Sequence, residues 1–441
     1  MHRWFPGVLQ ALALLVFVAL TVVGWQGATD ETRYTNLGNL AIWVIWWPAL
    51  IFVALFAARI WGTVCPIGFV TRHLGRFSLQ LKVPRRIRKH KLAIVLGLFL
   101  LHSIIISYHV HHVPRLTAVY LLVLMGYGIA ISLLFEKDAF CSAFCPLNGI
   151  IGTYAMLSPT ELRSKNRETC KSCQAHACLD TCPRNLYMGA AESSESCLLC
   201  FDCVKACPEN NVSFRLRKPL QGLWQRKNHT LPNALIVTIL LGIIIEEVGE
   251  EWARFEEVTT AVPNALVQWG VPASLFGYDW LIAAWLNFLL PLLVLGVAAL
   301  FARLLAGKGR VTQLFQRYAL GFVPLVFSLH LAKMWHKFNT KLTLLPYAAD
   351  DPGGQLTAAG LSTKTLASPP ALMGSSVEGI LLLLLLIAGL AATLYAIAQI
   401  ARAETKPLLP RRGAIPFHAT AVLLAAVFAV TIVNWFGLFG S

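Results

Sequence analysis

The sequence predicts a mainly α, polytopic helical membrane protein with one small α+β insert. The chain has 441 residues, of which 56% are hydrophobic and 13% are charged, and its mean hydropathy is +0.62. A soluble domain cannot bury that much apolar surface. Long apolar runs recur along the chain, and one polar stretch, roughly residues 138–230, separates them. Membrane spans on both sides of a polar insert are therefore expected.

About nine apolar runs are long enough to cross a bilayer, which takes about 20 helical residues. The first run resembles a signal peptide, but its apolar stretch is long, and we expect it to be retained as a helix. The runs lie at about residues 8–25, 40–60, 92–110, 117–135, 232–247, 279–304, 318–336, 378–400 and 416–437.

Charged residues between the runs set the expected orientation. Residues 72–91, 302–317 and 401–412 are basic, whereas residues 246–257 contain six glutamates. Nine spans with a cytoplasmic N-terminus place every basic loop inside and the acidic loop outside. The net charge of +15 is then explained by the membrane, and no nucleic-acid partner is expected. We predict a multi-pass protein of the bacterial inner (cytoplasmic) membrane.

The spans and the insert divide the chain into three expected domains. Residues 1–137 form a four-span membrane domain, and residues 231–441 form a five-span membrane domain. Between them, residues 138–230 form a domain on the cytoplasmic side.

The polar insert contains eight of the eleven cysteines, arranged in two runs. The second run has the [4Fe–4S] spacing of bacterial ferredoxins, and the first has two extra residues between its second and third cysteines. The first run is Cys170-x2-Cys173-x4-Cys178-x3-Cys182-Pro183. The second run is Cys197-x2-Cys200-x2-Cys203-x3-Cys207-Pro208.

This spacing predicts two [4Fe–4S] clusters in a double-cluster domain of the bacterial ferredoxin type. The fourth cysteine of each run is expected to ligate the other cluster. Zinc sites usually take their ligands as two pairs, and disulfides are disfavoured in a reducing cytoplasm. Because every iron then has a cysteine, we expect electron transfer and no substrate on the clusters. The expected ligands are Cys170, Cys173, Cys178 and Cys207 for cluster 1, and Cys182, Cys197, Cys200 and Cys203 for cluster 2.

Three cysteines lie outside these runs, in two Cys-Pro motifs that follow apolar segments. Cys65 and Cys145 each precede a proline, and Cys141 lies four residues before Cys145. With the double run, these motifs make residues 40–215 resemble the membrane polyferredoxins of the NapH/NosR/CcoG type, which are 4Fe-4S binding integral membrane proteins. That family usually shows Cys-x3-Cys-Pro twice, and here Trp61 replaces one cysteine. The resemblance implies a quinol-linked redox role, feeding periplasmic reductases or assisting the assembly of respiratory enzymes.

The three outlying thiols allow three interpretations. Cys65, Cys141 and Cys145 are candidates for part of a further metal centre, completed by a ligand other than cysteine. They also suit a thiol relay. Alternatively, they are buried cysteines that act as small apolar residues, which is the usual role of a free cysteine.

Ionisable residues inside the apolar runs are candidates for the catalytic site, because such residues are costly within a membrane. One hypothesis is a b-type haem held by a histidine from each of the third and seventh runs. A second is a set of proton acceptors at a quinol-oxidation site, for which the imidazole pKa is suited. The third is interfacial side chains without a redox role. The candidates are His102, His109, His330, His336, Glu246 and Glu247.

These features predict a membrane-bound electron-transfer protein, an oxidoreductase subunit of the quinol dehydrogenase type. The two clusters would link the quinone pool to a respiratory redox partner, in either direction of flow. Expected partners are the membrane, a quinone or quinol, and other subunits of a respiratory complex. The alternative is a redox-dependent assembly or maturation factor for a respiratory metalloenzyme, with Cys141 and Cys145 as working thiols. A redox sensor or a transporter is disfavoured, because the sequence shows neither an output domain nor a clear pair of broken helices.

Overall fold

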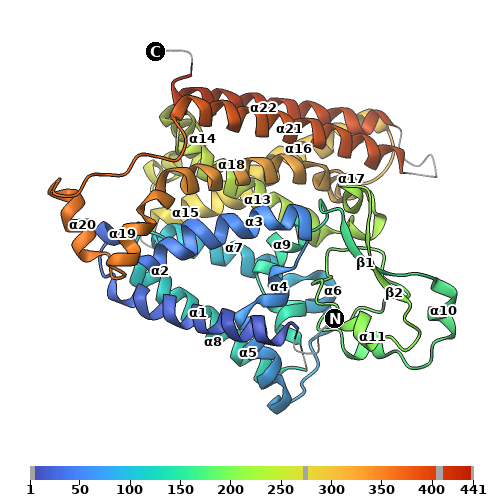
Figure 1. The fold of residues 1–441 in the computed structure, drawn as a ribbon. Coiled ribbons are helices and arrows are strands. Elements are labelled where there is room, and N and C mark those ends of the chain that lie inside the picture. Colours follow the sequence, from blue (N-terminus) through green and yellow to red (C-terminus); the bar gives the residue numbers. More distant parts are fainter. Residues whose placement is uncertain (1–4, 137, 272–276, 404–410, 439–441) are drawn as a thin grey trace. The chain divides into compact units, whose positions relative to one another are not determined.

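The computed structural model describes residues 5–136, 138–271, 277–403 and 411–438. These residues are mainly helical and contain one small two-stranded sheet, which confirms the predicted fold class (Figure 1). The chain separates into two compact units. Unit 1 comprises the residues up to Gly97 together with His111–Asn228 and Pro346–Leu366, and unit 2 comprises Leu98–Val110, His229–Leu345 and the residues from Ala367 onward. The three predicted domains remain a prediction.

Eight helical segments in the described ranges are long and apolar enough to cross a membrane. The predicted third run forms only a 16-residue helix, α7 (Leu92–Ser107), which is short for a span. Its helical conformation ends before His109, whose φ of 47° is left-handed, and Pro114 begins the next helix. The eight segments are Gly7–Gln26, Leu37–Ala57, Pro114–Leu134, Leu231–Gly249, Tyr278–Ala306, Val311–Asp350, Ser375–Arg402 and Arg412–Phe436.

Unit 1 contains α1, α8 and α5, which pack against one another. A parallel bridge between Leu81 and Phe135 ties the loop after α5 to the end of α8. The helices of this unit outside the insert are α1 (Gly7–Gln26), α2 (Leu37–Leu40), the π-helical η2 (Ala41–Trp46), α3 (Trp47–Ala57), α4 (Trp61–Val64), α5 (Pro66–Leu74), α6 (Arg85–His90), α8 (Pro114–Leu134), the π-helical η4 (Phe140–Phe144), α9 (Leu147–Tyr154), α19 (Leu345–Asp350) and α20 (Gln355–Ser362).

Each Cys-Pro motif marks a junction between two short helical segments. Cys65 ends α4 and is the N-cap of α5, where Pro66 takes the first helical position. Cys145 ends η4, and Pro146 precedes the first residue of α9. Proline suits a helix start because its fixed φ is compatible with the helix and its missing N–H would have no partner there. The two motifs therefore produce the same local structure twice.

A short antiparallel sheet closes the insert at its base. Strand β1 (Thr160–Ser164) pairs with β2 (Val212–Leu216), with Thr160 opposite Leu216 and Ser164 opposite Val212. Three short helices lie between the strands: α10 (Arg167–Ser172), α11 (Ala177–Asp180) and α12 (Asp202–Ala206). Pairing of the strands brings together the segments just after β1 and just before β2, where the first and last cysteines of the runs lie.

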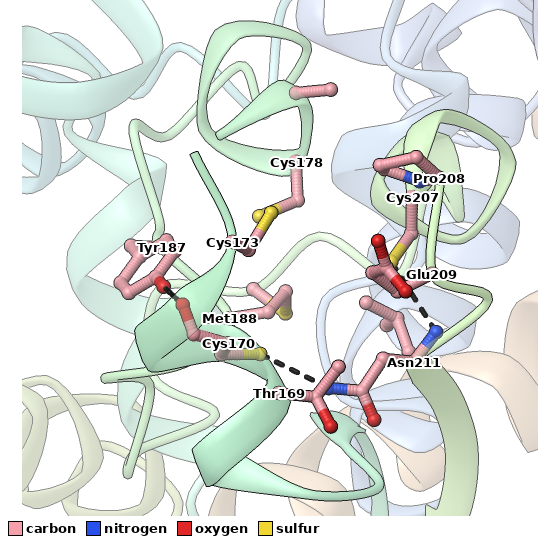
Figure 2. Close-up of a pocket in the computed structure, with 12 residues that line it drawn as sticks. Thr169, Cys170, Cys173, Cys178, Tyr187, Met188, Cys207, Pro208, Glu209 and Asn211 are labelled. Carbon is pink, nitrogen blue, oxygen red and sulfur yellow. Dashed lines mark hydrogen bonds between the residues drawn. The ribbon is translucent and has the colours of Figure 1, made fainter. Parts of the chain in front are cut away.

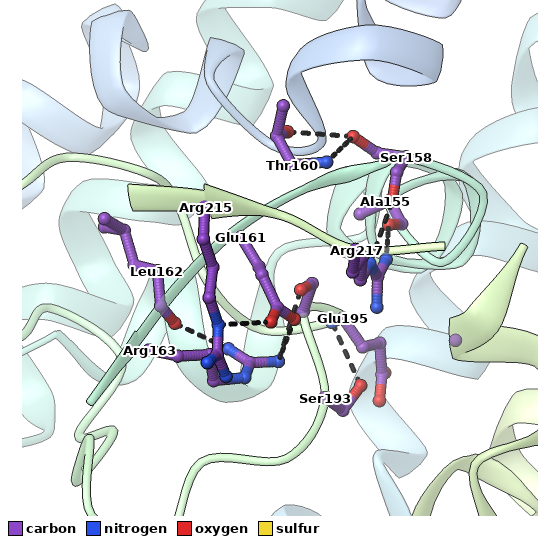
Figure 3. Close-up of polar contacts among 12 residues, drawn as sticks. Ala155, Ser158, Thr160, Glu161, Leu162, Arg163, Ser193, Glu195, Arg215 and Arg217 are labelled. Atoms are coloured by element: carbon purple, nitrogen blue, oxygen red, sulfur yellow. Dashed lines mark hydrogen bonds and ion pairs between the residues drawn. The ribbon is translucent and has the colours of Figure 1, made fainter. Parts of the chain in front are cut away.

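Arginine side chains stabilise this sheet, and two of them, Arg163 and Arg217, are buried (Figure 3). The Glu161 carboxylate accepts a hydrogen bond from Arg215 Nε at 3.0 Å and forms an ion pair with Arg163 at 3.2 Å. Arg217 donates to the carbonyl oxygens of Ser158 at 2.9 Å and Ala155 at 2.8 Å. Because Ala155 is the C-cap of α9, Arg217 satisfies a carbonyl at that helix end. The insert is thus attached to the helix that begins next to Cys145.

In unit 2, α13 and α18 are buried along most of their lengths and pack against each other. Helix α18 also contacts α21, which packs on α22. The helices of this unit are α13 (Leu231–Gly249), α14 (Ala253–Gln268), α15 (Tyr278–Ala284), the π-helical η8 (Trp285–Leu289), α16 (Leu290–Ala306), α17 (Val311–Tyr318), α18 (Val323–Lys341), α21 (Ser375–Arg402) and α22 (Ile415–Phe436).

Candidate functional site

The four cysteines expected to hold cluster 1 line one pocket in the insert (Figure 2). Cys170 lies on α10, Cys178 lies on α11, and Cys207 is the C-cap of α12. Cys173 follows α10 directly and completes the set. Cys207 of the second run therefore lines the same pocket as three cysteines of the first, and the crossed ligand assignment remains a prediction.

Asn211 directs two N–H groups at the sulfur atoms of this pocket. Its side-chain Nδ2 donates to Cys170 Sγ at 3.2 Å, and its backbone N donates to Cys207 Sγ at 3.3 Å. The Asn211 side chain also accepts a hydrogen bond from the backbone N of Asn166 at 2.9 Å, which fixes its orientation. Hydrogen bonds to cluster sulfurs are one means by which proteins set the reduction potential of an iron–sulfur centre. Sequence spacing gave no indication of this asparagine.

The four cysteines expected to hold cluster 2 also lie near one another. Cys197, Cys200 and Cys203 are buried. Burial raises the pKa of the Cys200 thiol to about 12, and the charge of Asp202 adds to this shift. Burial also raises the pKa of Cys203, and the charges of Cys197 and Cys200 raise it further. The charge of Cys182 also raises the pKa of Cys203, so Cys182 lies near the other three cysteines.

Both cysteine sets fit an iron–sulfur cluster by the chemistry of their donors. Thiols surround a pocket in a mainly apolar part of the insert, where Met188, Leu162 and Val212 form a buried cluster. N–H donors reach the sulfur atoms of the first set. Among the described residues, no group of three or more His, Cys, Asp or Glu side chains is arranged to hold a single metal ion, so the fit to a cluster rests on the donor types and on the shared pocket.

The structure also brings the three outlying cysteines together. Cys65, Cys141 and Cys145 pack against the same buried cluster, which includes Ile67 and Phe140. Burial raises the pKa of each of the three thiols to about 11. The charge of Cys141 adds to the rise in the pKa of Cys65, that of Cys145 adds to the rise for Cys141, and that of Cys65 adds to the rise for Cys145. The three thiols therefore lie close to one another.

Two arginines lie beside these thiols, the buried Arg59 and the half-buried Arg184, and sequence reasoning missed both. Burial and the positive charge of the neighbouring Arg184 together lower the pKa of Arg59 to about 9. The charges of Cys145 and Cys141 act on Arg59 in the opposite direction. Burial lowers the pKa of Arg184 as well, and Cys141 is the first group that opposes this shift. Arg59 lies at the end of an apolar run, where the positive-inside rule predicts basic residues, so the sequence did not single it out.

Two of the ionisable candidates in unit 2, the buried His102 and the half-buried Glu246, form a pair. His102 Nε2 lies 3.2 Å from Glu246 Oε2. His330 is buried on α18, while Glu247 is half-buried and His109 is exposed outside α7. The structure therefore joins His102 to Glu246, whereas His109 lies beyond the end of α7.

A second polar group on α18 involves carboxylates from two other helical segments. Lys333 Nζ lies 2.8 Å from Glu250 and 2.5 Å from Glu251. His336 Nδ1 lies 3.2 Å from Glu378 Oε1, which is buried in the first turn of α21. Sequence reasoning missed Glu378, although a lone acidic residue at the start of an apolar run was a usable signal.

Comparison with known proteins adds a family assignment to this geometry. Residues 40–89 and 117–165 match a family model described as a 4Fe-4S binding domain. Two segments of the chain are therefore similar to a 4Fe-4S binding domain. This result, together with the two relatives below, confirms the predicted resemblance to a membrane polyferredoxin. The matched segments contain Cys65, Cys141 and Cys145 but none of the eight cysteines of the insert.

Two curated proteins similar to this chain have names that refer to electron transport or ferredoxins. The chain is 28% identical over 150 residues to YccM of Escherichia coli (strain K12), whose name assigns it to electron transport; the match covers 33% of this chain and 40% of YccM. It is 26% identical over 188 residues to the methylamine utilization ferredoxin-type protein MauN of Paracoccus denitrificans (strain Pd 1222), covering 38% of this chain and 65% of MauN. The chain thus spans less than two thirds of either relative. No solved structure matches it.

Proposed function

We propose that this electron-transport protein carries electrons between the quinone pool and a respiratory redox partner through two [4Fe–4S] clusters. The observation that carries the proposal is the pocket lined by Cys170, Cys173, Cys178 and Cys207, in a chain whose described residues include eight apolar helices of spanning length. The protein would act as an oxidoreductase subunit of the quinol dehydrogenase type, in the bacterial inner membrane with the insert on the cytoplasmic side.

The ligands of each cluster follow from the two cysteine neighbourhoods. When bound, the clusters accept and release single electrons. The protein's part is to hold eight thiolates in a largely apolar insert, to donate hydrogen bonds from Asn211, and to keep the two sets adjacent. Adjacency is supported by Cys178 and Cys203, which belong to the same buried cluster of residues.

The pair of His102 and Glu246 is the proposed proton acceptor for quinol oxidation. Oxidising a quinol releases two protons with two electrons, so a site must remove protons as well as electrons. A buried imidazole paired with a carboxylate can accept a proton and pass it on. Glu246 occupies Nε2 of His102, the nitrogen most often used for iron, and this favours proton transfer over a haem ligand. The second group, with Lys333, His336 and Glu378, would extend this path.

Reduction of anaerobically purified protein tests the proposal. Dithionite should produce the EPR signals of reduced [4Fe–4S] clusters, and iron and sulfide should be present in matching amounts. A sample that shows no such signal when fully reduced would refute the proposal. Comparing cluster reduction by a quinol analogue with that by a soluble low-potential donor then gives the direction of electron flow.

A further inference from the structure

The two-stranded sheet of the insert begins at the end of a helix of spanning length. The carbonyl oxygen of Phe56, near the end of α3, accepts hydrogen bonds from Ser158 Oγ and Thr160 Oγ1, both at 2.9 Å. Thr160 is the first residue of β1, and Ser164 is the last. A strand rises about 3.3 Å per residue, so the two ends of β1 lie about 13 Å apart. One end of the sheet is therefore attached to a spanning segment, and the other end is remote from it.

The expected ligands of cluster 1 lie at the remote end of the sheet. Ser164 pairs with Val212 at that end. Asn211, which precedes Val212, donates to Cys170 Sγ at 3.2 Å and to Cys207 Sγ at 3.3 Å. The pocket of cluster 1 is therefore at the end of the sheet opposite to α3.

The loop that carries cluster 2 is attached to the chain just after α3. Thr63 Oγ1 of α4 donates to the carbonyl oxygen of Leu198 at 2.6 Å, and Leu198 lies between Cys197 and Cys200. A Cβ on Gly62 would lie 2.6 Å from Leu198 Cδ2, so the two segments are in close contact. Helix α4 follows the spanning segment that ends with α3. Cluster 2 is thus expected on the membrane side of the insert.

Arg59 extends this attachment to the Cys-Pro motifs. Its Nη1 donates to the carbonyl oxygen of Glu195 at 2.8 Å, two residues before Cys197. Burial lowers the pKa of Arg59, and the charges of Cys145 and Cys141 oppose this shift, so Arg59 also lies near those thiols. Both thiols belong to a segment that is similar to a 4Fe-4S binding domain. The cluster 2 loop therefore adjoins the part of unit 1 that the family model matches.

The two cluster sites also differ in their exposure to solvent. Residues 197–200 of the cluster 2 loop are all buried. In contrast, residues 174–176, directly after Cys173, and residues 208–210, directly after Cys207, are exposed. Three of the four cysteines expected to hold cluster 2 are buried, against two of the four for cluster 1. The solvent side of the insert is therefore the side of cluster 1.

We propose that the two clusters act in a fixed order, with cluster 2 on the membrane side and cluster 1 as the site of electron exchange with a redox partner that approaches from solvent. This order rests on the proposed function, because it needs both clusters and a link to the quinone pool. One electron at a time would pass between cluster 2 and cluster 1, with no bond made or broken. The order is the same for either direction of net flow.

Quinol reduction of single-cluster variants of the full-length protein tests the order. Cys207→Ala removes an expected ligand of cluster 1, and a quinol analogue should still reduce cluster 2 in this variant. Cys182→Ala removes an expected ligand of cluster 2, and reduction of cluster 1 by the quinol analogue should be lost. Dithionite should reduce the remaining cluster in both variants. Ser213→Ala, on β2, is the control and should keep quinol reduction of both clusters.

Two results with these variants would overturn the order. One is reduction of cluster 1 by quinol in Cys182→Ala at the rate of the unsubstituted protein. The other is loss of quinol reduction of cluster 2 in Cys207→Ala. If quinol reduces neither cluster in the unsubstituted protein, the proposed function fails, and the solvent side of the pair is then decided by a measurement that needs no quinol.

A water-soluble paramagnetic dysprosium complex supplies that measurement, and it also decides if the cysteine variants fail to accumulate. In the partly reduced, unsubstituted protein, the complex should enhance the electron spin relaxation of cluster 1 more than that of cluster 2. The two EPR signals are told apart by Asn211→Ala, which should shift the potential of cluster 1 only. Equal enhancement, or a larger effect on cluster 2, would contradict the proposed order.

Discussion

Asn211 illustrates what a single residue contributes beyond the cysteine pattern. The spacing of the cysteines predicted which thiols belong together, because a cubane needs ligands from a tight loop and a remote partner. The N–H groups that reach Cys170 and Cys207 come from a residue just before β2. An asparagine beside a turn is ordinary in a sequence, so only the folded chain shows that its side chain faces sulfur.

Replacing Asn211 by Ala should lower the reduction potential of cluster 1. The hydrogen bond to Cys170 Sγ favours the more negative, reduced cluster, and its loss should shift the midpoint by on the order of tens of millivolts. An EPR-monitored redox titration measures this shift. Ser213→Ala, two residues further along on β2, is the control and should leave the potential unchanged. An unshifted midpoint in Asn211→Ala would contradict the assignment of this pocket to a cluster.

The crossed ligand sets predict opposite losses for two cysteine variants. Cys207→Ala should remove the EPR signal that Asn211→Ala shifts, because Cys207 lines the pocket of cluster 1. Cys182→Ala should retain that signal and lose the other. Iron content should fall by about half in each variant, because one of two clusters is lost. A complete loss of iron would instead indicate a general loss of folding. The reverse pattern would show that each run holds its own cluster.

The pair of His102 and Glu246 predicts a specific loss of quinol oxidation. His102→Gln and Glu246→Gln should each slow cluster reduction by a quinol analogue about 100-fold, the usual scale of a lost proton acceptor. Reduction by dithionite and iron content should not change. His109→Asn is the matched control, because His109 is exposed and lies outside the pair. Equal quinol rates in all three variants would rule out this site.

At the scale of elements, the apolar runs located the helices but not their packing. Runs such as α13 are apolar on all sides, so their periodicity does not indicate which face is buried. The central positions of α13 and α18 in unit 2 therefore appeared only in the structure. The π-helical turns η2, η4 and η8 likewise leave no clear signature in the sequence. Each Cys-Pro motif stands at a helix start, which the fixed φ of proline favours.

Gly242 permits a close helix contact in unit 2, and its replacement should destabilise the protein. A Cβ at this position on α13 would lie 2.5 Å from Asn287 Cα of η8. Gly242→Val should therefore lower the thermal midpoint in detergent, at a cost of about 1–3 kcal/mol, which is typical of overpacking. Gly296→Val on α16 is the control, because no atom lies within 4 Å of its Cβ position. Equal midpoints for the two variants would contradict this packing.

At the scale of the whole molecule, composition and charge predicted a membrane protein, and the eight apolar helices confirm that class. The predicted orientation of the insert in the membrane depends on α7, whose 16 residues are few for a membrane span. If α7 crosses the membrane, the insert lies inside and residues 250–257 lie outside. If α7 does not cross, both assignments reverse. The distribution of basic residues favours the first arrangement.

Reporter fusions distinguish the two topologies. Alkaline phosphatase, which is active only outside the cytoplasm, should be active when fused after Glu257 and inactive when fused after Asn228 at the end of the insert. Fusion after Lys308, in a basic loop, should also be inactive, and fusion after Lys82, which precedes α7, should be inactive in both topologies and serves as the control. An active fusion at Asn228 together with an inactive one at Glu257 would show that α7 does not span.

Cluster reduction by quinol tests the central claim most directly. The anaerobic, oxidised protein should develop reduced [4Fe–4S] EPR signals when a quinol analogue is added without any other donor, and Glu246→Gln should lose most of that response. Clusters that dithionite reduces but no quinol reduces, and that no quinone reoxidises, would contradict a link to the quinone pool.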